Sequence, residues 1–267
     1  MRLTKHHSLG NDFLVLLDRD GTRPVTGATA LAICDRHRGV GADGLLRVTA
    51  RSGVGNGVSN VSMQLFNADG GRAEMSGNGI SCLAQAVVLA GIVPGPTVTV
   101  STEAGKRTVR IEPTGDAREH RATVDMGVAK VLDEEADWID SAVIRAAHVD
   151  IGNPHLVLHV PKLVDDDELI ARGRRANDLV PGGINVELVT TGSQPDELVM
   201  QVYERGVGVT EACGTGACAV AAAAEHWGLA GRSVRVRQPG GPADIVLGPT
   251  IEMTVPVVHV ATIDWAA

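Results

Sequence analysis

The sequence has very few aromatic side chains. Phe, Trp and Tyr make up 2% of the 267 residues, whereas glycine occurs 32 times. A stacking platform for single-stranded nucleic acid needs several exposed rings, so the composition argues strongly against a site of that kind. The core must instead be built from Val, Ala, Leu and Ile.

The sequence also lacks a basic field and a long apolar run near its start. It carries 24 Lys and Arg against 32 Asp and Glu, a net charge of −8, so we expect no nucleic-acid partner. The apolar run Phe13–Leu17 is too short for a signal peptide or a membrane span. We therefore expect a cytoplasmic protein without a membrane partner.

Cysteine is sparse, and no two cysteines have the CxxC spacing. The four are Cys34, Cys82, Cys213 and Cys218. Without a secretion signal, they indicate reduced thiols and not a disulfide framework. Cys82 and Cys218 lie in apolar runs, where we expect them in the cores of helices.

Three segments recur later in the chain in the same order, which indicates an internal duplication. The aligned pairs are Leu9–Leu16 with Ile151–Leu158, Gly41–Leu46 with Gly183–Leu188, and Glu74–Ile80 with Glu211–Ala217. We expect two similar halves related by a pseudo-twofold axis. A pocket between them would receive Ser76 from one half and Cys213 from the other.

The periodicity predicts an α+β protein in which each half wraps a sheet or barrel around a central helix. The central helices are predicted at Ile80–Ala90 and Ala217–Trp227, because both runs are apolar on nearly every side. A surface helix with acidic residues in its first turn is predicted at Asp165–Arg174. Strands rich in β-branched residues are predicted at Phe13–Leu17, Gly44–Val48, Val61–Phe66, Thr97–Thr102 and Thr108–Glu112. A loop is predicted at Gly53–Asn60 and a polar linker at Pro113–Arg121.

A Ser or Cys precedes each central helix, in Ser76-Gly77-Asn78-Gly79 and in Cys213-Gly214-Thr215-Gly216. The exposed N–H groups and the dipole make a helix start electropositive, so it can bind a carboxylate. The same field lowers a thiol pKa from about 8.5 towards neutrality. Two such starts at one pocket would place a proton-transferring group on each face of the carbon beside the carboxylate. That arrangement suits inversion of a Cα centre by general acid–base catalysis.

Three other motifs lack the context that their usual functions need. The GxGxxG run Gly39–Gly44 precedes a strand and is followed by no acidic residue up to Ala68, which argues against a dinucleotide site. Glu74 stands two residues before Ser76, so there is no GxSxG nucleophile elbow. His155 and His159 lie on a predicted strand, where residues four apart are too distant to share a zinc ion.

Taken together, six segments resemble the diaminopimelate epimerase family, in the family's order from residue 5 to residue 219. They are Lys5–Asp12 (KHHSLGND), Asp35–Leu46 (DRHRGVGADGLL), Phe66–Leu83 (FNADGGRAEMSGNGISCL), Gly152–His155 (GNPH), Gly183–Val186 (GINV) and Tyr203–Ala219 (YERGVGVTEACGTGACA). The resemblance implies interconversion of LL- and meso-diaminopimelate without a metal, pyridoxal phosphate or nucleotide cofactor. It also implies a homodimer. Because the family's C-terminal segment returns to the first domain, we expect domains at 1–118 with 257–267 and at 119–256.

The resemblance also implies roles for individual residues. Cys213 matches one of two catalytic cysteines, and Ser76 falls where the other should be. Glu204 and His155 match polar groups that hold an ammonium and tune the thiols. Gly77, Asn78, Gly214 and Thr215 match the donors that hold the reacting carboxylate, and Asn11, Asn67, Asn153, Asn185 and Arg205 match further substrate-binding positions. An arginine suits the distal carboxylate of a diamino diacid.

Three positions depart from the family pattern. Ser76 replaces a cysteine, and a hydroxyl is a much weaker acid than a thiol. Gly44 stands where some members have glutamine, and Val209 where many have glutamate. Ser76 leaves three explanations open, namely a Ser/Cys pair that still epimerises, an engineered inactive form, or a drifted substrate or reaction. The alternatives to the epimerase are a racemase of another amino acid, such as histidine, and a catalytically inactive protein that binds a diamino acid.

Overall fold

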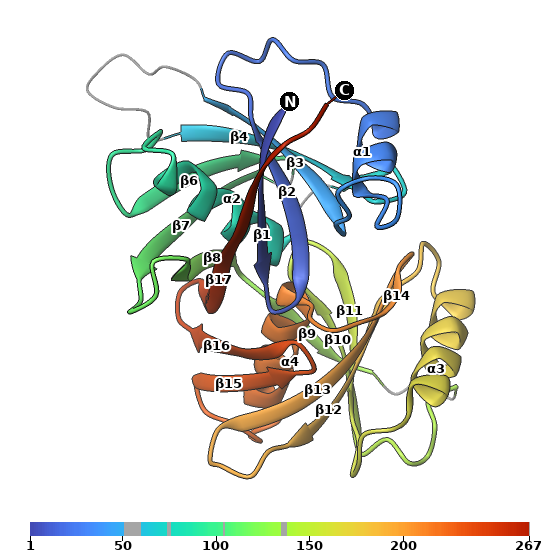
Figure 1. Ribbon diagram of the computed structural model, residues 1–267. Coiled ribbons are helices and arrows are strands. Elements are labelled where there is room, and N and C mark those ends of the chain that lie inside the picture. The colour runs from blue at the N-terminus through green and yellow to red at the C-terminus, as the bar shows by residue number, and fades with distance from the viewer. Residues whose placement is uncertain (51–59, 74–75, 104, 135–137, 267) are drawn as a thin grey trace. The chain divides into compact units, whose positions relative to one another are not determined.

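The computed structural model describes residues 1–50, 60–73, 76–103, 105–134 and 138–266. The chain divides into two compact units (Figure 1). Unit 1 comprises Met1–Asp125 and Thr254–Ala267, and unit 2 comprises Met126–Met253. No helix among the described residues combines the length and apolar character needed to cross a membrane.

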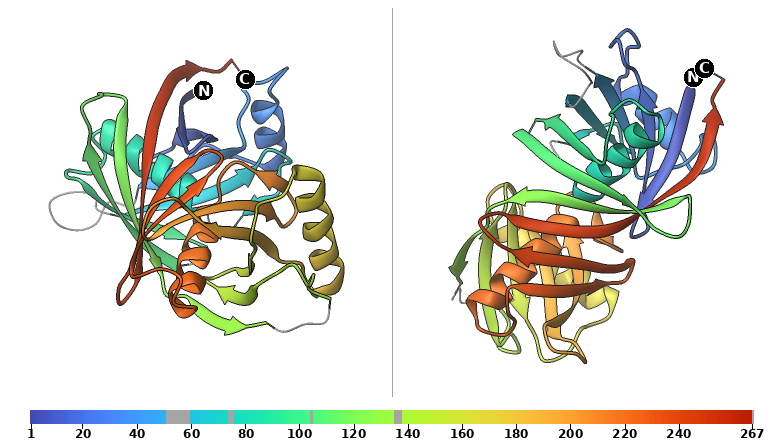
Figure 2. Two further views of the ribbon diagram at one scale, coloured as in Figure 1. Left: turned by 90° about the horizontal axis from the view of Figure 1, so that it is seen from below. Right: turned by 90° about the vertical axis from the view of Figure 1, so that its left-hand side faces the viewer.

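The strands of unit 1 form a closed ring. Its successive pairings are β1–β2, β2–β3, β3–β4, β4–β6, β6–β7, β7–β8, β8–β17 and β17–β1. The bounds are β1 Arg2–Ser8, β2 Asn11–Leu17, β3 Gly44–Ala50, β4 Asn60–Asn67, β5 Arg72–Ala73, β6 Thr97–Thr102, β7 Gly105–Pro113, β8 Glu119–Gly127 and β17 Ile251–Asp264. Both chain ends lie together in this unit, because Arg2 pairs with Asp264 (Figure 2).

Unit 2 repeats the pairing order of unit 1. From β10 to β16 the pairs are antiparallel, parallel, antiparallel, parallel and antiparallel, as they are from β1 to β7. The bounds are β9 Lys130–Asp133, β10 Arg145–Asp150, β11 Pro154–His159, β12 Asn185–Thr191, β13 Glu197–Glu204, β14 Gly208–Thr210, β15 Ser233–Gln238 and β16 Gly241–Leu247. The common order is the structural trace of the duplication in the sequence.

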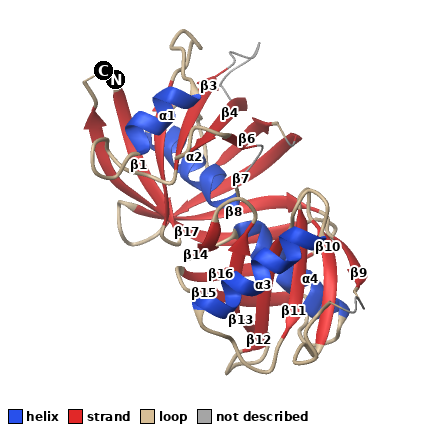
Figure 3. Cartoon of the chain, turned by 90° about the vertical axis from the view of Figure 1, so that its right-hand side faces the viewer, coloured by secondary structure: helices blue, strands red, loops and turns tan. Residues whose placement is uncertain are grey.

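Each unit packs its strands around one buried helix (Figure 3). Helix α2 (Gly77–Leu89) contacts β1, β2, β6 and β7, and α4 (Gly214–His226) contacts β10 to β13, β15 and β16. A second helix packs on the strands of each unit, α1 (Gly27–Cys34) on β3 and β4, and α3 (Asp166–Leu179) on β12 to β14. The predicted α+β class with a central helix in each half is confirmed.

The two central helices fill their units with different side chains. Ile80, Leu83 and Val87 of α2 are completely buried, and each contributes roughly 2 kcal/mol of transfer free energy. In α4, small side chains occupy most buried positions, from Ala217 to Ala224. Small side chains let the surrounding strands approach the helix closely.

Cys82 and Cys218 lie completely buried in these helices, as predicted. Burial raises the pKa of both thiols above the usual range, because the apolar interior disfavours a thiolate. Cys34 lies in α1, where burial and the nearby carboxylates of Asp12 and Asp43 raise its pKa to about 11. These three thiols are poor candidates for proton transfer at neutral pH.

The structure extends or corrects several predicted elements. Helix α3 runs to Leu179, five residues beyond the predicted end, with the Asp165 carboxylate capping its first turn by accepting from the Glu168 N–H. The polar segment expected as a linker forms the turn of the β7–β8 hairpin, in which Pro113 pairs with His120. Of the predicted loop at 53–60, residues 53–59 lie outside the described residues.

The strand pairings align the second segment of the internal repeat differently, by one residue, from the alignment based on the sequence. Gly44 pairs with Phe13 on one side and Asn67 on the other. In unit 2, Asn185 pairs with His155, and the register of β12 with β13 places it opposite Glu204. Gly44 therefore corresponds to Asn185, and the sequence alignment that placed it over Val186 is wrong at this point.

Candidate active site

Ser76 and Cys213 cap the two central helices with almost the same backbone conformation. Ser76 has φ −139° and ψ 126°, and its Oγ accepts a hydrogen bond from the Gly79 N–H at 3.0 Å. Cys213 has φ −128° and ψ 112°, and its Sγ accepts from the Gly216 N–H at 3.3 Å. Both side chains therefore act as N-caps and lie in the positive field of a helix start.

The glycine three residues after each cap lies where a side chain would crowd its neighbours. A Cβ at Gly79 would lie 3.1 Å from the Cβ of Ser76. A Cβ at Gly216 would lie 2.7 Å from Oε1 of Glu187 and 3.3 Å from Sγ of Cys213. The repeated Gly-x-Gly thus lets the cap side chain, and in unit 2 a carboxylate, approach the helix start.

Cys213 lies among polar groups of unit 2. It is 5% exposed, and its backbone N–H donates to Oε1 of Gln238 at 2.7 Å. Its Sγ lies 3.4 Å from Oγ1 of Thr215. The carboxylate of Glu204, whose negative charge acts on the thiol, accepts from Oγ1 of Thr210 at 2.5 Å. The backbone and side chain of Cys213 are therefore held on several sides.

The expectation that the helix start lowers the pKa of Cys213 is wrong for this structure. Burial and the negative charges of Glu204 and Glu187 raise its pKa well above the usual range. The hydrogen bonds from Thr215 and Gly216 act in the opposite direction but are weaker. Burial also raises the pKa of Glu204. Because both pKa values are raised, a proton on either group is retained to higher pH than in water.

His155 extends this polar cluster towards the interior. It is completely buried on β11, where Nδ1 lies 2.6 Å from Oε1 of Glu187. Its Nε2 lies 3.1 Å from Oδ1 of Asn153, and Nδ2 of Asn153 donates to Oγ1 of Thr215 at 3.4 Å. His155 thus connects to the cap of α4 through Asn153 and Thr215. Glu187 was not predicted as a site residue, although a carboxylate inside an apolar strand was a visible signal in the sequence.

Asn185 and Arg205 lie together at another position in unit 2. The Asn185 side chain donates to the Pro154 carbonyl at 3.1 Å and accepts from the Arg205 N–H at 2.9 Å. The exposed guanidinium of Arg205 donates through Nη1 to the Gly182 carbonyl at 3.0 Å. Within the described residues this is the only bond of the guanidinium, so its other N–H groups can meet an anion.

The remaining predicted residues belong to unit 1. Nδ2 of Asn11 donates to Oδ2 of Asp43 at 2.8 Å, and Asp43 also accepts from the guanidinium of Arg36. Asn67 ends β4. Asn78 lies in the first turn of α2, 2% exposed, and its buried Oδ1 has no hydrogen-bond partner among the described residues.

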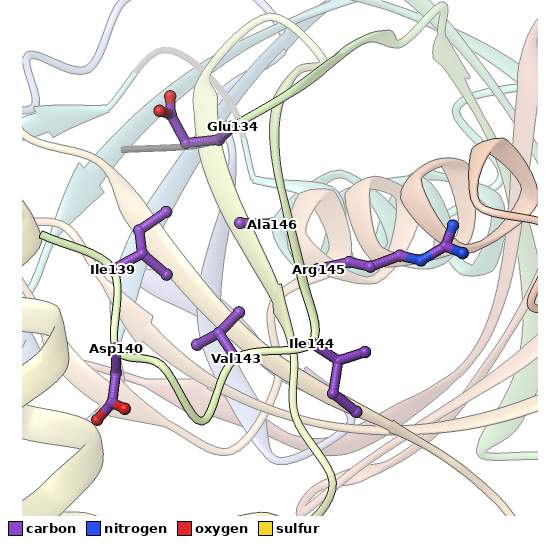
Figure 4. A pocket seen from close by; sticks show the side chains of 7 residues that line it. All are labelled: Glu134, Ile139, Asp140, Val143, Ile144, Arg145 and Ala146. Atoms are coloured by element: carbon purple, nitrogen blue, oxygen red, sulfur yellow. The ribbon is translucent and has the colours of Figure 1, made fainter. Parts of the chain in front are cut away.

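Two pockets lined by described residues of unit 2 do not contain the predicted catalytic side chains. Figure 4 shows one of about 230 Å³, lined by Glu134, Ile139, Asp140, Val143, Ile144, Arg145 and Ala146. The guanidinium of Arg145 donates to the Trp227 carbonyl, so it has a structural partner. The second pocket, of about 590 Å³, includes Gln238 in its lining. Within the described ranges, no group of three or more His, Cys, Asp or Glu side chains is arranged to hold a metal ion.

Known proteins resemble the chain over nearly its whole length. The profile of the diaminopimelate epimerase family matches residues 3–132 and 147–256. A diaminopimelate epimerase of Thermobifida fusca is 38% identical over 259 residues, covering 92% of this chain and 91% of that protein. One of Corynebacterium glutamicum is 38% identical over 249 residues, covering 90% and 89%.

A solved structure has the same fold at low sequence identity. The structure described as a predicted epimerase from Pseudomonas aeruginosa superposes with a TM-score of 0.72 at 17% identity, covering 100% of this chain and 99% of that one. The sequence matches identify the family, whereas this likeness identifies the fold alone. The chain belongs to the diaminopimelate epimerase family.

Proposed function

We propose that the protein interconverts LL- and meso-2,6-diaminopimelate by moving a proton at one α-carbon, without pyridoxal phosphate or a metal. The observation that carries the proposal is the pair of matching helix starts, one capped by Ser76 and the other by Cys213. Membership of the family and relatives named diaminopimelate epimerase support the choice of substrate. They do not favour a racemase of another amino acid.

The first turns of α2 and α4 bind the reacting α-carboxylate in this proposal. Their N–H groups come from Gly77 and Asn78 in one unit and from Gly214 and Thr215 in the other. The first N–H groups of a helix have no partner within the helix and face negative charge favourably. Holding the carboxylate there presents the adjacent α-carbon to the cap side chains.

Arg205 binds the distal carboxylate of the substrate. Its guanidinium is exposed and has one bond to a carbonyl, and Asn185 holds the adjacent backbone. An arginine presents parallel N–H donors that match a carboxylate. Asn11, Asn67 and Asn153 supply amide groups to the remaining polar atoms of the substrate.

Proton transfer uses Cys213 on one face of the α-carbon and Ser76 on the other. Glu204 accepts the thiol proton, the Cys213 thiolate removes the α-proton, and the Ser76 hydroxyl donates a proton to the opposite face. The Ser76 alkoxide then takes a proton from water and Glu204 releases its proton to water, which restores both groups. The reverse reaction needs Ser76 as the base, which is harder because a hydroxyl holds its proton more tightly than a thiol. We therefore expect α-proton exchange at the Cys213 face to be faster than inversion.

The first experiment gives LL-diaminopimelate to the reduced protein in D₂O and follows it by proton NMR and chiral chromatography. Loss of the α-proton signal together with meso product supports epimerisation. Exchange without meso product assigns the defect to the Ser76 face. No exchange, either in this protein or in Ser76→Cys, contradicts the substrate assignment and favours an inactive binding protein, which calorimetry with the same ligand would test.

The assembly and location of the protein are separate proposals. We infer a homodimer in the cytoplasm, with the small-molecule substrate as its ligand. The four cysteines are all free thiols, which is typical of a reducing compartment. Light scattering coupled to size-exclusion chromatography tests the dimer, and a single species of monomer mass at working concentration contradicts it.

A further inference from the structure

Glu187 is a completely buried carboxylate to which the proposed reaction gives no role. It lies in the middle of β12, between the apolar residues Val186 and Leu188. Oε1 is 2.6 Å from Nδ1 of His155, whereas the buried Oε2 has no hydrogen-bond partner among the described residues. A buried carboxylate oxygen without a partner is costly, so this position contributes poorly to stability.

Unit 1 shows that the fold does not need this carboxylate. The strand registers make Leu46 the counterpart of Glu187 and Phe13 the counterpart of His155. Leu46 is 0% exposed and Phe13 is 4% exposed, so the same two positions form an apolar core in unit 1. The same strand order is therefore built with or without a buried acid and histidine.

The contacts of Glu187 lead to the Cys213 thiol. His155 contacts Oδ1 of Asn153 through Nε2, and Nδ2 of Asn153 donates to Thr215, whose Oγ1 lies 3.4 Å from Sγ of Cys213. Each ring nitrogen of His155 therefore faces a side-chain oxygen, Oε1 of Glu187 on one side and Oδ1 of Asn153 on the other. A ring that donates to both oxygens carries a positive charge, which an ionised Glu187 would balance.

We propose that Glu187 is a positioning residue for the epimerase reaction. By holding a proton on Nδ1 of His155, it keeps the ring charged and directs Nε2–H to Asn153. Asn153 then keeps its N–H groups towards Thr215 and the helix start that bears Cys213. Glu187 acts through these groups and does not itself touch the substrate. The inference rests on the proposed function, because its kinetic effect is defined for diaminopimelate.

Glu187→Gln tests the proposal with little change in shape. The amide cannot balance a charged ring, so His155 becomes neutral and one ring nitrogen loses its proton. We expect kcat for LL-diaminopimelate to fall roughly 10-fold or more, with KM changed less than about threefold. The ring itself is observed by ¹⁵N NMR of histidine-labelled protein, with the His155 signals assigned by their absence in His155→Phe. We expect both His155 nitrogens to be protonated in the parent and one to be unprotonated in the variant.

A second variant separates positioning from folding. The double change Glu187→Leu with His155→Phe installs the residues of unit 1 at the same positions, so we expect a folded protein with a strongly reduced kcat. Asp18→Asn is the matched control, because Asp18 is a buried carboxylate of unit 1 bonded to Arg47. It should lower the thermal midpoint but leave kcat and the His155 signals unchanged.

The two failures are distinguishable. If His155 is neutral in the parent, or if Glu187→Gln leaves both kcat and the His155 signals unchanged, the role of Glu187 is overturned. A charged His155 that Glu187→Gln neutralises, in a protein without activity on diaminopimelate, overturns the proposed function while the structural link remains. A fall in kcat for Glu187→Gln that Asp18→Asn reproduces equally indicates destabilisation alone and also overturns the proposal.

Discussion

The two helix starts have matching backbones and contrasting surroundings. In unit 1, three neighbouring positions of the strand ladder carry Phe13, Leu46 and Asn67, none of which is charged. The corresponding positions around Cys213 of unit 2 carry His155, Glu187 and Glu204. The two units thus share the cap, the glycine and the strand order, whereas these three positions are titratable in unit 2 alone.

This difference separates two functions of a helix start. The N–H groups that bind a carboxylate come from the backbone, so both units provide them whatever their neighbouring side chains are. The strength of a proton donor or acceptor depends on desolvation and nearby charge, which differ between the units. We infer that each unit offers a carboxylate-binding helix start, whereas proton transfer is dominated by unit 2.

The largest effect is expected when the two caps are made alike. Cys213→Ser replaces the thiol with a second hydroxyl. The hydroxyl still caps α4, but it is a much weaker acid than the thiol and therefore a poor proton-transfer group. Epimerisation and α-proton exchange should both fall roughly 10³-fold or more. NMR in D₂O measures both rates, and circular dichroism verifies that the variant folds. Retention of more than about a tenth of the exchange would show that the thiol is not the main base.

Removing the carboxylate at the thiol should have a smaller effect. Glu204→Gln eliminates a carboxylate whose charge raises the pKa of the Cys213 thiol. We expect kcat to fall roughly 100-fold, while thiolate absorbance develops at lower pH than in the parent. Glu211→Gln, at an exposed position near the same cap, is the control and should change neither. An unchanged absorbance titration would mean that Glu204 does not affect the thiol.

Restoring a thiol to the other half should increase activity. Ser76→Cys supplies a stronger acid and a better base at the start of α2, and each pKa unit of mismatch is worth about 1.4 kcal/mol. We expect inversion to rise at least about 10-fold, with α-proton exchange at the Cys213 face changed much less. Chiral chromatography and exchange rates on the same samples give the ratio. Equal increases in both rates would contradict the separation of the two faces.

The smallest effect concerns the buried histidine of unit 1. His6 is completely buried, and its ring contacts the side-chain amide of Gln85, whereas the ring of His155 contacts a carboxylate. Burial, together with the nearby His259 and His7, lowers the pKa of His6 from 6.5 to about 4. Between these values the unfolded chain binds the proton more readily, so stability falls as the pH falls from 6.5 towards 4. From about pH 7.5 to about pH 5.5, this group should cost about 1 kcal/mol of unfolding free energy.

Urea unfolding at the two pH values measures this loss. His6→Asn lacks the titrating ring, so its stability should depend less on pH than that of the parent over this range. The difference between the two proteins removes the contribution of other groups, including His120. A parent and a variant with the same pH dependence would show that His6 is not the group responsible.

Local features of the sequence determined much of the fold and the candidate site. The cap residues Ser76 and Cys213, their glycines and the apolar runs that follow are adjacent along the chain, so helix chemistry alone indicates both helix starts. The repeat and the six family segments further identified the α+β class and the family. The division into domains at residues 118 and 257, and the individual roles of the site residues, stay predictions.

Only the tertiary structure decided the electrostatics of the site. Glu187 contacts His155 because β11 and β12 pair in parallel, although helix α3 separates the two strands in the sequence. The register of this pair is set by packing as well as by the local sequence pattern. The raised pKa of Cys213 has the same origin, because it depends on burial and on carboxylates contributed by β12 and β13. The positive field of the helix start favours a thiolate. Burial beside carboxylates that are distant in the sequence reverses that preference.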